Sequence, residues 1–379
     1  MAWLATMVVL LAITGATPSQ AAPTRSVCPD GASLIGDPPP TGYRQWCSYR
    51  GSDGKLVFHG RYRQWHDNGK LQLEGDFARG KRDGRWTEYD EAGLRVVDST
   101  YRDDQLEGPY SGLVDGQRIE GQFKAGLRGG VWRNFDRDGE KSSEGTYRDG
   151  VRSGRWTLWL EDGSRAEGNF QDDVRSGRWV IYSTSGLRRA EGPVVAGRRK
   201  GQWTEYDDNG LVLAKGAYVD DMRDGKWTIF YASGHKQASG TFRDNKKSGE
   251  WSETDSDGRR WQGRYEAGAK SGMWTCLHPN GKPAERGEMG DGKRDGEWIY
   301  FDVKGVVTAH GPYVDDKRAG TWTEAAKDGG YVEGEYRAGE RDGLWVAYSI
   351  DGEARAEMRF SGGLRVDTKA ATAPGSTVP

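Results

Sequence analysis

The sequence has few of the residues from which most catalytic and metal sites are built. Its 379 residues include only three cysteines and five histidines, aliphatic side chains are scarce, and the mean hydropathy is −0.86. The formal net charge of −2 lacks the basic excess of a nucleic-acid-binding protein. These shortages argue against a large aliphatic core, and we expect no metal, no cofactor and no nucleic acid.

The residue types used in catalysis are present but scattered. The histidines fall in different segments and phases of the sequence: His59, His66, His235, His278 and His310. The serines stand in turn-like segments without a nucleophile elbow. The stretch DSDG at 255–258 resembles the start of a calcium loop, but it lacks the downstream Glu. We therefore expect no catalytic residue, no metal ligand and no enzyme.

Apolar runs of membrane-spanning length are also missing. The apolar stretch Ala2–Ile13 is too short to cross a bilayer, and small residues follow it, with Ser19 and Ala21 at the −3 and −1 positions of a cleavage site. The n-region has no Lys or Arg, so a wrong start codon and an uncleaved anchor are alternatives. We predict a signal peptide at 1–21 and an exported protein that is periplasmic, outer-membrane-associated or secreted.

Cys28 and Cys47 bracket a Gly/Pro-rich segment ahead of the repeats described below. In an exported protein this pair predicts a disulfide, which would close a loop of about 20 residues and stabilise the fold by about 3 kcal/mol. Two cysteines cannot make a tetrahedral zinc site, and no His pair stands near them at ligand spacing. We predict a Cys-bridged N-terminal cap at 22–53, and Cys276 as a packed thiol without a chemical role.

Glycine and tryptophan are abundant, with 57 Gly and 16 Trp. The phrase DGRWTEYDEAG at 83–93 returns along the chain in variants that share a Gly, any residue and a Trp. The first glycine of each phrase, here named the anchor glycine, recurs every 22 to 24 residues at Gly60, Gly84, Gly108, Gly130, Gly154, Gly177, Gly201, Gly225, Gly249, Gly272, Gly296, Gly320 and Gly343. Trp follows two residues later in 11 repeats, at Trp86, Trp132, Trp156, Trp179, Trp203, Trp227, Trp251, Trp274, Trp298, Trp322 and Trp345. Tyr62 and Tyr110 fill the other two places. Thirteen units at a fixed period indicate a repeat architecture.

Each repeat divides into two short segments typical of strands. The first reads GxWxx[Y/F] and ends in a turn such as DNG or EDG, where Asn-Gly and Asp-Gly favour positive φ at two positions. The second reads EGx[Y/F], as in 74–77, and a second turn leads to the next anchor. We predict an all-β protein in which about 13 tandem β-hairpins, at 54–365, form an elongated meander of about 26 strands in one twisted antiparallel sheet.

The glycines suggest how the rings pack. Residues i and i+2 of a strand share a face, so Gly84 lies on the side of Trp86, and Gly75 on the side of Phe77. We expect each ring to cover a bare glycine on a neighbouring strand. Trp86 and Tyr89 should lie on opposite faces.

The cycle EGxYxxGxxxGxWxxYxxxG resembles the MORN repeat, and is closest to its bacterial YwqK-type variant. This resemblance implies a hairpin solenoid and a binding or scaffolding role, and the YwqK-type group carries an antitoxin label. The chain departs from the pattern where Lys215, Ser239, Gln262, Arg286 and His310 replace the Glu. Met358 replaces the Gly of the last unit, and we predict a disordered tail at 366–379.

One basic residue stands two places before almost every anchor glycine. This basic rim comprises Arg82, Arg128, Arg152, Arg175, Arg199, Arg223, Lys247, Lys270, Arg294, Arg318 and Arg341. It could bind an anionic surface, an acidic glycan or an acidic protein. Alternatively, each cation packs on a neighbouring Trp or pairs with a nearby carboxylate.

Together these features predict a non-enzymatic, exported scaffold of the bacterial envelope that binds another protein. A cell-wall or glycan-binding role is the first alternative, since the Gly/Trp/Tyr hairpins are also similar to choline- and glucan-binding repeats. An antitoxin or immunity partner of a toxin is the second, although a cytoplasmic antitoxin would need no signal sequence.

Overall fold

The computed structural model describes residues 28–114 and 116–370. These residues form 33 strands and no helix, arranged as one open antiparallel sheet, which confirms the predicted all-β hairpin meander. Among them there is accordingly no helix that could span a membrane. The predicted signal peptide at 1–21 lies outside the described residues.

The chain divides into two compact units. Unit 1 comprises the described residues up to Glu140 together with Tyr147–Gly150, and unit 2 comprises Lys141–Thr146 and the described residues from Val151 onward. The strands of unit 1 are β1 (Ser33–Ile35), β2 (Arg44–Arg50), β3 (Leu56–Trp65), β4 (Leu71–Ala78), β5 (Lys81–Arg82), β6 (Gly84–Tyr89), β7 (Arg95–Arg102), β8 (Gln105–Leu106), β9 (Gly108–Val114), β10 (Gln117–Lys124) and β11 (Leu127–Phe135). Strand β12 (Lys141–Arg148) contributes residues to both units.

Unit 2 continues the same pattern. Its strands are β13 (Val151–Trp159), β14 (Arg165–Gln171), β15 (Val174–Tyr182), β16 (Arg188–Val195), β17 (Arg198–Arg199), β18 (Gly201–Tyr206), β19 (Val212–Val219), β20 (Met222–Phe230), β21 (Lys236–Arg243), β22 (Lys246–Thr254), β23 (Arg260–Glu266), β24 (Ala269–Leu277), β25 (Pro283–Gly290), β26 (Lys293–Phe301), β27 (Val307–Val314), β28 (Lys317–Arg318), β29 (Gly320–Ala325), β30 (Tyr331–Arg337), β31 (Glu340–Tyr348), β32 (Ala354–Ser361) and β33 (Leu364–Ala370).

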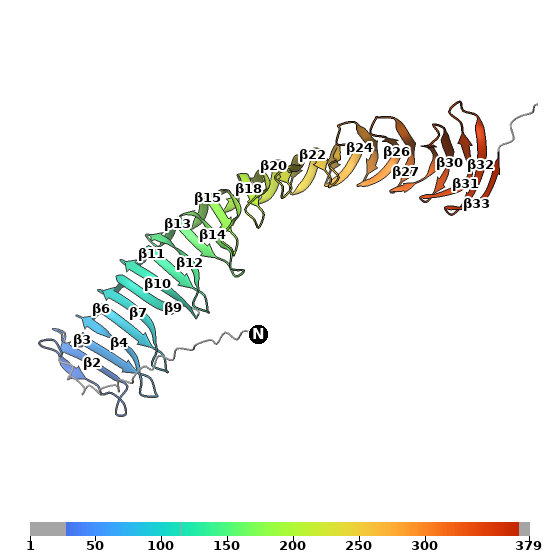
Figure 1. Ribbon diagram of the computed structural model, residues 1–379. Coiled ribbons are helices and arrows are strands. Elements are labelled where there is room, and N and C mark those ends of the chain that lie inside the picture. The colour runs from blue at the N-terminus through green and yellow to red at the C-terminus, as the bar shows by residue number, and fades with distance from the viewer. Residues whose placement is uncertain (1–27, 115, 371–379) are drawn as a thin grey trace, which may run out of the picture. The chain divides into compact units, whose positions relative to one another are not determined.

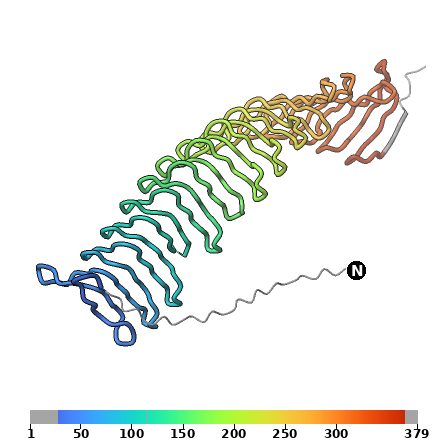
Figure 2. The backbone as a smooth tube through the Cα atoms, turned by 60° about the vertical axis from the view of Figure 1, so that its left-hand side comes forward, coloured from blue at the N-terminus to red at the C-terminus, as the bar shows by residue number. Residues whose placement is uncertain are grey.

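Strands pair with their neighbours in chain order. In unit 2, for example, β18 pairs with β19 and β19 with β20, all antiparallel, and successive hairpins lie side by side (Figures 1 and 2). Four short strands (β5, β8, β17 and β28) are the first parts of anchor strands that are interrupted just before the anchor glycine. With these joined, and with β1, β2 and β33 set aside, the 13 repeats supply the 26 strands that the sequence predicts.

The two turns of a repeat differ in backbone conformation. In the narrow turn, after the EGx[Y/F] strand, two successive residues have positive φ, as in Ala196 (50°) and Gly197 (81°). This is the type I′ geometry of tight hairpins. In the wide turn, after the Trp strand, only the final glycine has positive φ, as in Gly210 (81°). The prediction of two positive-φ residues in the DNG-type turns was therefore wrong, because these turns are wider than a two-residue hairpin loop.

Each Trp ring lies over a glycine of the preceding strand. The glycine is that of the EGx[Y/F] segment, here named the covered glycine, and a Cβ built on any of the 11 would lie 2.1 to 2.6 Å from the indole. All 11 rings are 4% exposed or less. In ten repeats the indole Nε1 also donates to the carbonyl of the residue after the covered glycine, as Trp227 does to Ala217 at 2.9 Å.

The anchor glycines have a different role from the one expected. All 13 have φ between 61° and 98°, and a Cβ on Gly84 would meet no atom within 4 Å. The strand that carries Gly225 is bulged relative to the strand before it. Gly216 pairs with Trp227, but two residues later Tyr218 pairs with Arg223, four residues earlier on the partner strand. Gly225 lies within the segment that this shift leaves unpaired. The expectation that the rings cover glycines holds for the covered glycines alone, whereas the anchors permit a left-handed bulge that brings the Trp into place.

The two repeats without Trp show why glycine is required. Tyr110 follows a strand in which Ser99 stands where the covered glycine would be. Tyr62 follows β2, in which the register shifts around Cys47 at the corresponding place. In these two repeats the covered position carries a side chain, Ser99 ahead of Tyr110 and Trp46 opposite Tyr62, and the smaller ring replaces the indole.

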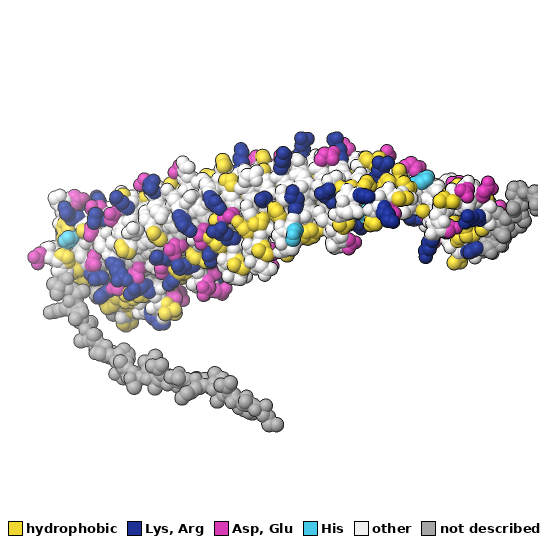
Figure 3. Space-filling view, turned by 45° about the horizontal axis from the view of Figure 1, so that its top comes forward, with side chains coloured by type: hydrophobic (Ala, Val, Ile, Leu, Met, Phe, Trp, Pro, Cys, Tyr) yellow, Lys and Arg dark blue, Asp and Glu magenta, His cyan; other side chains and the backbone are white. Residues whose placement is uncertain are grey.

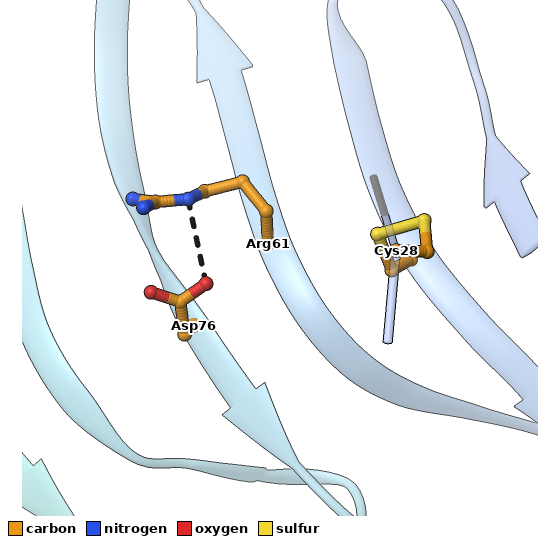
Figure 4. The surroundings of a disulfide bond; sticks show 4 residues. Cys28, Arg61 and Asp76 are labelled. Carbon is orange, nitrogen blue, oxygen red and sulfur yellow. Dashed lines mark ion pairs between the residues drawn. A yellow bond between two sulfur atoms is a disulfide. The ribbon is translucent and has the colours of Figure 1, made fainter. Parts of the chain in front are cut away.

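The N-terminal cap packs on the first repeat. Cys28 and Cys47 form a disulfide, and Cys47 is buried in β2 (Figure 4). Pro29 lies against Gly60, and a Cβ built on Gly60 would lie 2.4 Å from the Cδ of Pro29. Beside the cap, Arg61 of β3 and Asp76 of β4 form an ion pair at 3.4 Å.

At the other end the structure differs from the predicted tail. Strand β33 begins at Leu364, and Val366–Ala370 belong to it, paired with β32. The turn Gly362–Gly363 has positive φ at both residues, as in the other narrow turns, so the chain completes one more strand than the period predicts. Residues 371–379 lie outside the described part of the chain.

The covered glycine predicts a specific substitution effect. Gly216→Ala should lower the free energy of unfolding by about 1–3 kcal/mol, because the new methyl would lie 2.3 Å from the Trp227 ring. Gly290→Ala, whose Cβ would have no neighbour closer than 3.5 Å, should change it by no more than about 0.5 kcal/mol. Urea denaturation followed by near-UV circular dichroism measures both.

A paired substitution tests the fit of ring to glycine directly. Gly216→Ser combined with Trp227→Tyr reproduces the combination found at Ser99 and Tyr110. The double variant should be more stable than the sum of the two single changes, with a coupling of about 0.5–3 kcal/mol. Strict additivity would contradict the proposed contact.

Candidate functional site

The sheet has two chemically different faces. The inner face, defined as the face that carries the Trp rings, also holds the last residue of each EGx[Y/F] segment, which is aromatic except at Val194 and Met289. Ring follows ring, as from Tyr218 to Trp227 at 5.3 Å between centroids and from Trp227 to Phe242 at 6.0 Å, both edge to face. The outer face carries the residue three places after the Trp, which is Tyr or Phe in seven of the 11 repeats with Trp. Tyr89, for example, donates to Glu74 at 3.1 Å on the side opposite Trp86, as the sequence predicts.

The basic rim lies over the inner-face rings. All 11 of its cations stand within 6 Å of an aromatic centroid, as Arg223 does over Trp227 at 4.4 Å. Nine of them also pair with a carboxylate, as Arg223 does with Glu205 at 2.5 Å. Arg128 instead donates to the hydroxyl of Tyr147 at 3.2 Å.

Most rim cations are therefore partly buried and neutralised within the protein. The two signs of charge also alternate on the face seen in Figure 3, which shows no field of one sign. Of the two interpretations of the rim, these contacts favour packing and ion pairing. Arg175, whose guanidinium lies 5.6 Å from the Trp179 ring, has no carboxylate partner within the described residues.

Aspartates of the narrow turns join successive repeats. The second turn residue, when it is Asp or Asn, accepts from the backbone N–H of a rim residue one repeat earlier, as Asp221 does from Arg199 at 3.0 Å. Asp104, Asp173, Asn245 and Asp316 do the same. Asp and Asn tolerate the positive φ of this position better than other side chains do. The Asp-Asp pairs in the sequence are the signal that would have predicted these bonds.

Two wide turns carry a clamp that sequence reasoning missed. His66, Asn68 and Lys70 bind the backbone carbonyls of residues 89, 91 and 92 in the next repeat, at 2.8 to 2.9 Å. His278, Asn280 and Lys282 bind the carbonyls of residues 301, 303 and 304 in the same way. The phrases HDNGK and HPNGK thus join successive repeats, with one ring nitrogen of each histidine bonded to a backbone carbonyl.

The outer face changes character along unit 2. In β14 and β16 the Glu of the EGx[Y/F] segment is paired, since Glu167 binds Arg155 at 2.7 Å and Glu191 binds Arg178 at 2.7 Å. Over β20 to β23 this Glu is replaced by Ser239 and Gln262, and an open groove of about 580 Å³ crosses the strands. The groove is lined by residues of four consecutive strands, β20 to β23.

Unit 1 has a smaller, aromatic hollow on the inner face. It measures about 280 Å³ and lies beside Phe58, Tyr62, Phe77, Trp86 and Tyr101. The smaller ring of Tyr62 and the exposed position of Phe58 near the cap leave this space. Its walls are the same rings that form the core of the first repeats.

Buried ionisable groups gather on the inner face of unit 2. Burial alone would raise the pKa of Glu253, but hydrogen bonds from Lys247 and Tyr265 and the charge of Lys270 lower it. Burial raises the pKa of Glu285, although Arg294 and Arg259 lie at 2.7 and 3.8 Å.

Cys276 is fully buried near these carboxylates. Burial raises the pKa of its thiol to about 11, so it is protonated at neutral pH, in keeping with a packed thiol. No group of three or more His, Cys, Asp or Glu side chains in the described residues is placed to hold a metal ion.

The depressed pKa of Glu253 has a consequence for stability. A carboxyl whose folded pKa lies below its unfolded value stabilises the protein above that unfolded pKa, near 4.3, and loses this contribution as the pH falls through the folded pKa. Glu253→Gln should therefore be less stable than the parent at pH 7, and the difference should shrink below about pH 4.5. Glu266→Gln is the control, because Glu266 is exposed and has no ion-pair partner within the described residues. Thermal unfolding at a series of pH values measures both, and a difference independent of pH would contradict the role of the Glu253 charge.

Comparison with known proteins agrees with the repeat geometry. The family model described as "MORN repeat variant" matches residues 58–78 and 223–244. Each match covers one hairpin in the same phase, β3–β4 and β20–β21, and begins two residues before an anchor glycine. No curated protein matches the chain. The two matches support the identification of this chain as a MORN-repeat protein.

Proposed function

We propose that the chain is a non-enzymatic, exported scaffold that binds another protein through exposed aliphatic side chains along the narrow turns of unit 2. MORN repeats and an open repeat sheet are compatible with a protein-interaction scaffold. The observation that carries the proposal is a row formed by Val174, Val195, Val219 and Met222, which are 45%, 52%, 43% and 38% exposed.

The row follows from strand alternation. Val194 faces inward and is 5% exposed, so Val195 faces outward, and its cross-strand neighbour is Arg198. Val219 pairs with Met222 in the next narrow turn. Neighbouring repeats lie two strands apart, about 10 Å, so these side chains can form one strip. An apolar strip bordered by charged residues is the pattern of a protein–protein interface.

The inner face and the basic rim offer less to a protein partner. The Trp rings are buried, and most cations of the basic rim already hold a ring and a carboxylate. Export rests on the segment at 1–21, and placement in the YwqK-type group rests on the cycle of residues in the repeat. An antitoxin role stays a prediction from that resemblance.

The row predicts where a partner attaches. A photo-crosslinking residue at Val195 of the full chain, expressed in its native cell, should label one protein. The same residue at Val303, which is 59% exposed on a wide turn, should not. Val195→Asp with Val219→Asp should weaken binding of that protein by at least about tenfold while leaving thermal unfolding within a few degrees of the parent, because both sites are exposed.

Two deletions of whole repeats complete the test. Removing residues 177–224 deletes part of the row, and removing residues 272–319 leaves it intact. Repeat proteins tolerate such deletions because each unit contacts only its neighbours. The first deletion should abolish binding and the second should preserve it. Equal binding by the two, or crosslinking from Val303 alone, would overturn the proposal.

A further inference from the structure

The groove on the outer face of unit 2 is lined by polar side chains that form no hydrogen bond within the described residues. Its wall carries four half-buried hydroxyl groups and one amide, from Thr228, Ser239, Thr241, Ser252 and Gln262. None of these side chains has a hydrogen-bond partner within the described residues. In β14, by contrast, the residue at the position of Ser239 is Glu167, which pairs with Arg155 and Arg165.

The charges at the groove are also unpaired. Lys226 and Glu250 stand one repeat apart, each at the residue after an anchor glycine, and neither forms an ion pair within the described residues. Their charges cancel, so the groove has no net charge. The backbone of Gly240, between Ser239 and Thr241, forms part of the floor.

The groove is long as well as polar. Its residues come from four consecutive strands, β20, β21, β22 and β23, which places its ends about 14 Å apart at the usual strand spacing. A site of this length fits several units of a linear molecule.

The chemistry of the wall selects among ligands. Hydroxyl groups both donate and accept hydrogen bonds, and an amide offers both functions, which matches a ligand whose own hydroxyls do the same. An acyl chain needs apolar walls, and a nucleic acid needs a net positive charge. We propose that this groove binds a neutral glycan, with Thr228, Ser239, Thr241, Ser252 and Gln262 hydrogen-bonding its hydroxyl groups across several sugar units.

The proposal is independent of the protein-binding row. The row lies at the narrow turns, whereas the groove crosses the middle of the strands, and the two sites share no residue. Loss of partner binding in the Val195 and Val219 variants leaves the groove untouched, so either proposal can fail without the other.

The test uses the full chain and soluble tetrasaccharides of glucose, N-acetylglucosamine and galacturonic acid, measured by isothermal titration calorimetry. At least one of the two neutral sugars should bind with a Kd below about 1 mM, and its Kd should change less than about twofold between roughly 50 and 500 mM salt. Thr228→Val with Ser252→Ala should weaken this binding by about tenfold or more, since two hydrogen bonds are lost. Thr323→Val, at the position of Thr228 in another repeat, should leave it unchanged.

Three results would overturn the proposal. The first is that neither neutral sugar binds. The second is that only the acidic sugar binds and is released by salt, which would point to the cations of the chain instead. The third is that the groove variant binds as tightly as the Thr323→Val control.

Discussion

The contact between an indole ring and a bare glycine is the interaction on which the rest of this structure depends. A single sheet has no second layer to bury its apolar face, and each Trp solves this by lying back over the preceding strand. The covered glycine removes the side chain that would hold the ring away, and the anchor glycine supplies the left-handed bulge that lets the ring reach it. Ring after ring then forms a continuous apolar surface with very few aliphatic residues.

The charged residues complete this surface. A Trp exposed on one side would still lose much of its hydrophobic contribution, and the rim cations close that side by lying over the rings. Their own charges are balanced by inner-face carboxylates such as Glu205 and Glu324, and by turn aspartates such as Asp221. These cations and carboxylates are therefore part of the packing around the rings. This explains how a chain of such low mean hydropathy can fold.

Much of this could be predicted from the sequence. The period, the two strands per repeat, the opposite faces of Trp86 and Tyr89 and the covering of glycine by a ring all follow from alternation and spacing. The role of the anchor glycines was predicted wrongly. Strand alternation does not reveal a bulge, which can be recognised only when the register of two paired strands is known. The wide-turn clamps were not predicted because their side chains bind backbone carbonyls about 23 residues away. Every residue has a backbone carbonyl, so the sequence does not mark which ones accept these bonds. The only sign of the groove in the sequence is that Ser239 and Gln262 replace the Glu of the repeat. Whether a side chain lacks a hydrogen-bond partner can be judged only once its neighbours in space are known.

Met358 occupies the covered position of the last repeat, and strand β33 brings no ring to lie on it. An indole cannot lie over a methionine as it does over a glycine. A further copy of the repeat added after β32 would therefore have no bare glycine for its first tryptophan to cover. Duplication of an internal unit carries both the glycine and the ring, and so preserves every junction. A further repeat after β32 would therefore need a glycine at residue 358, or a smaller ring such as the one that follows Ser99.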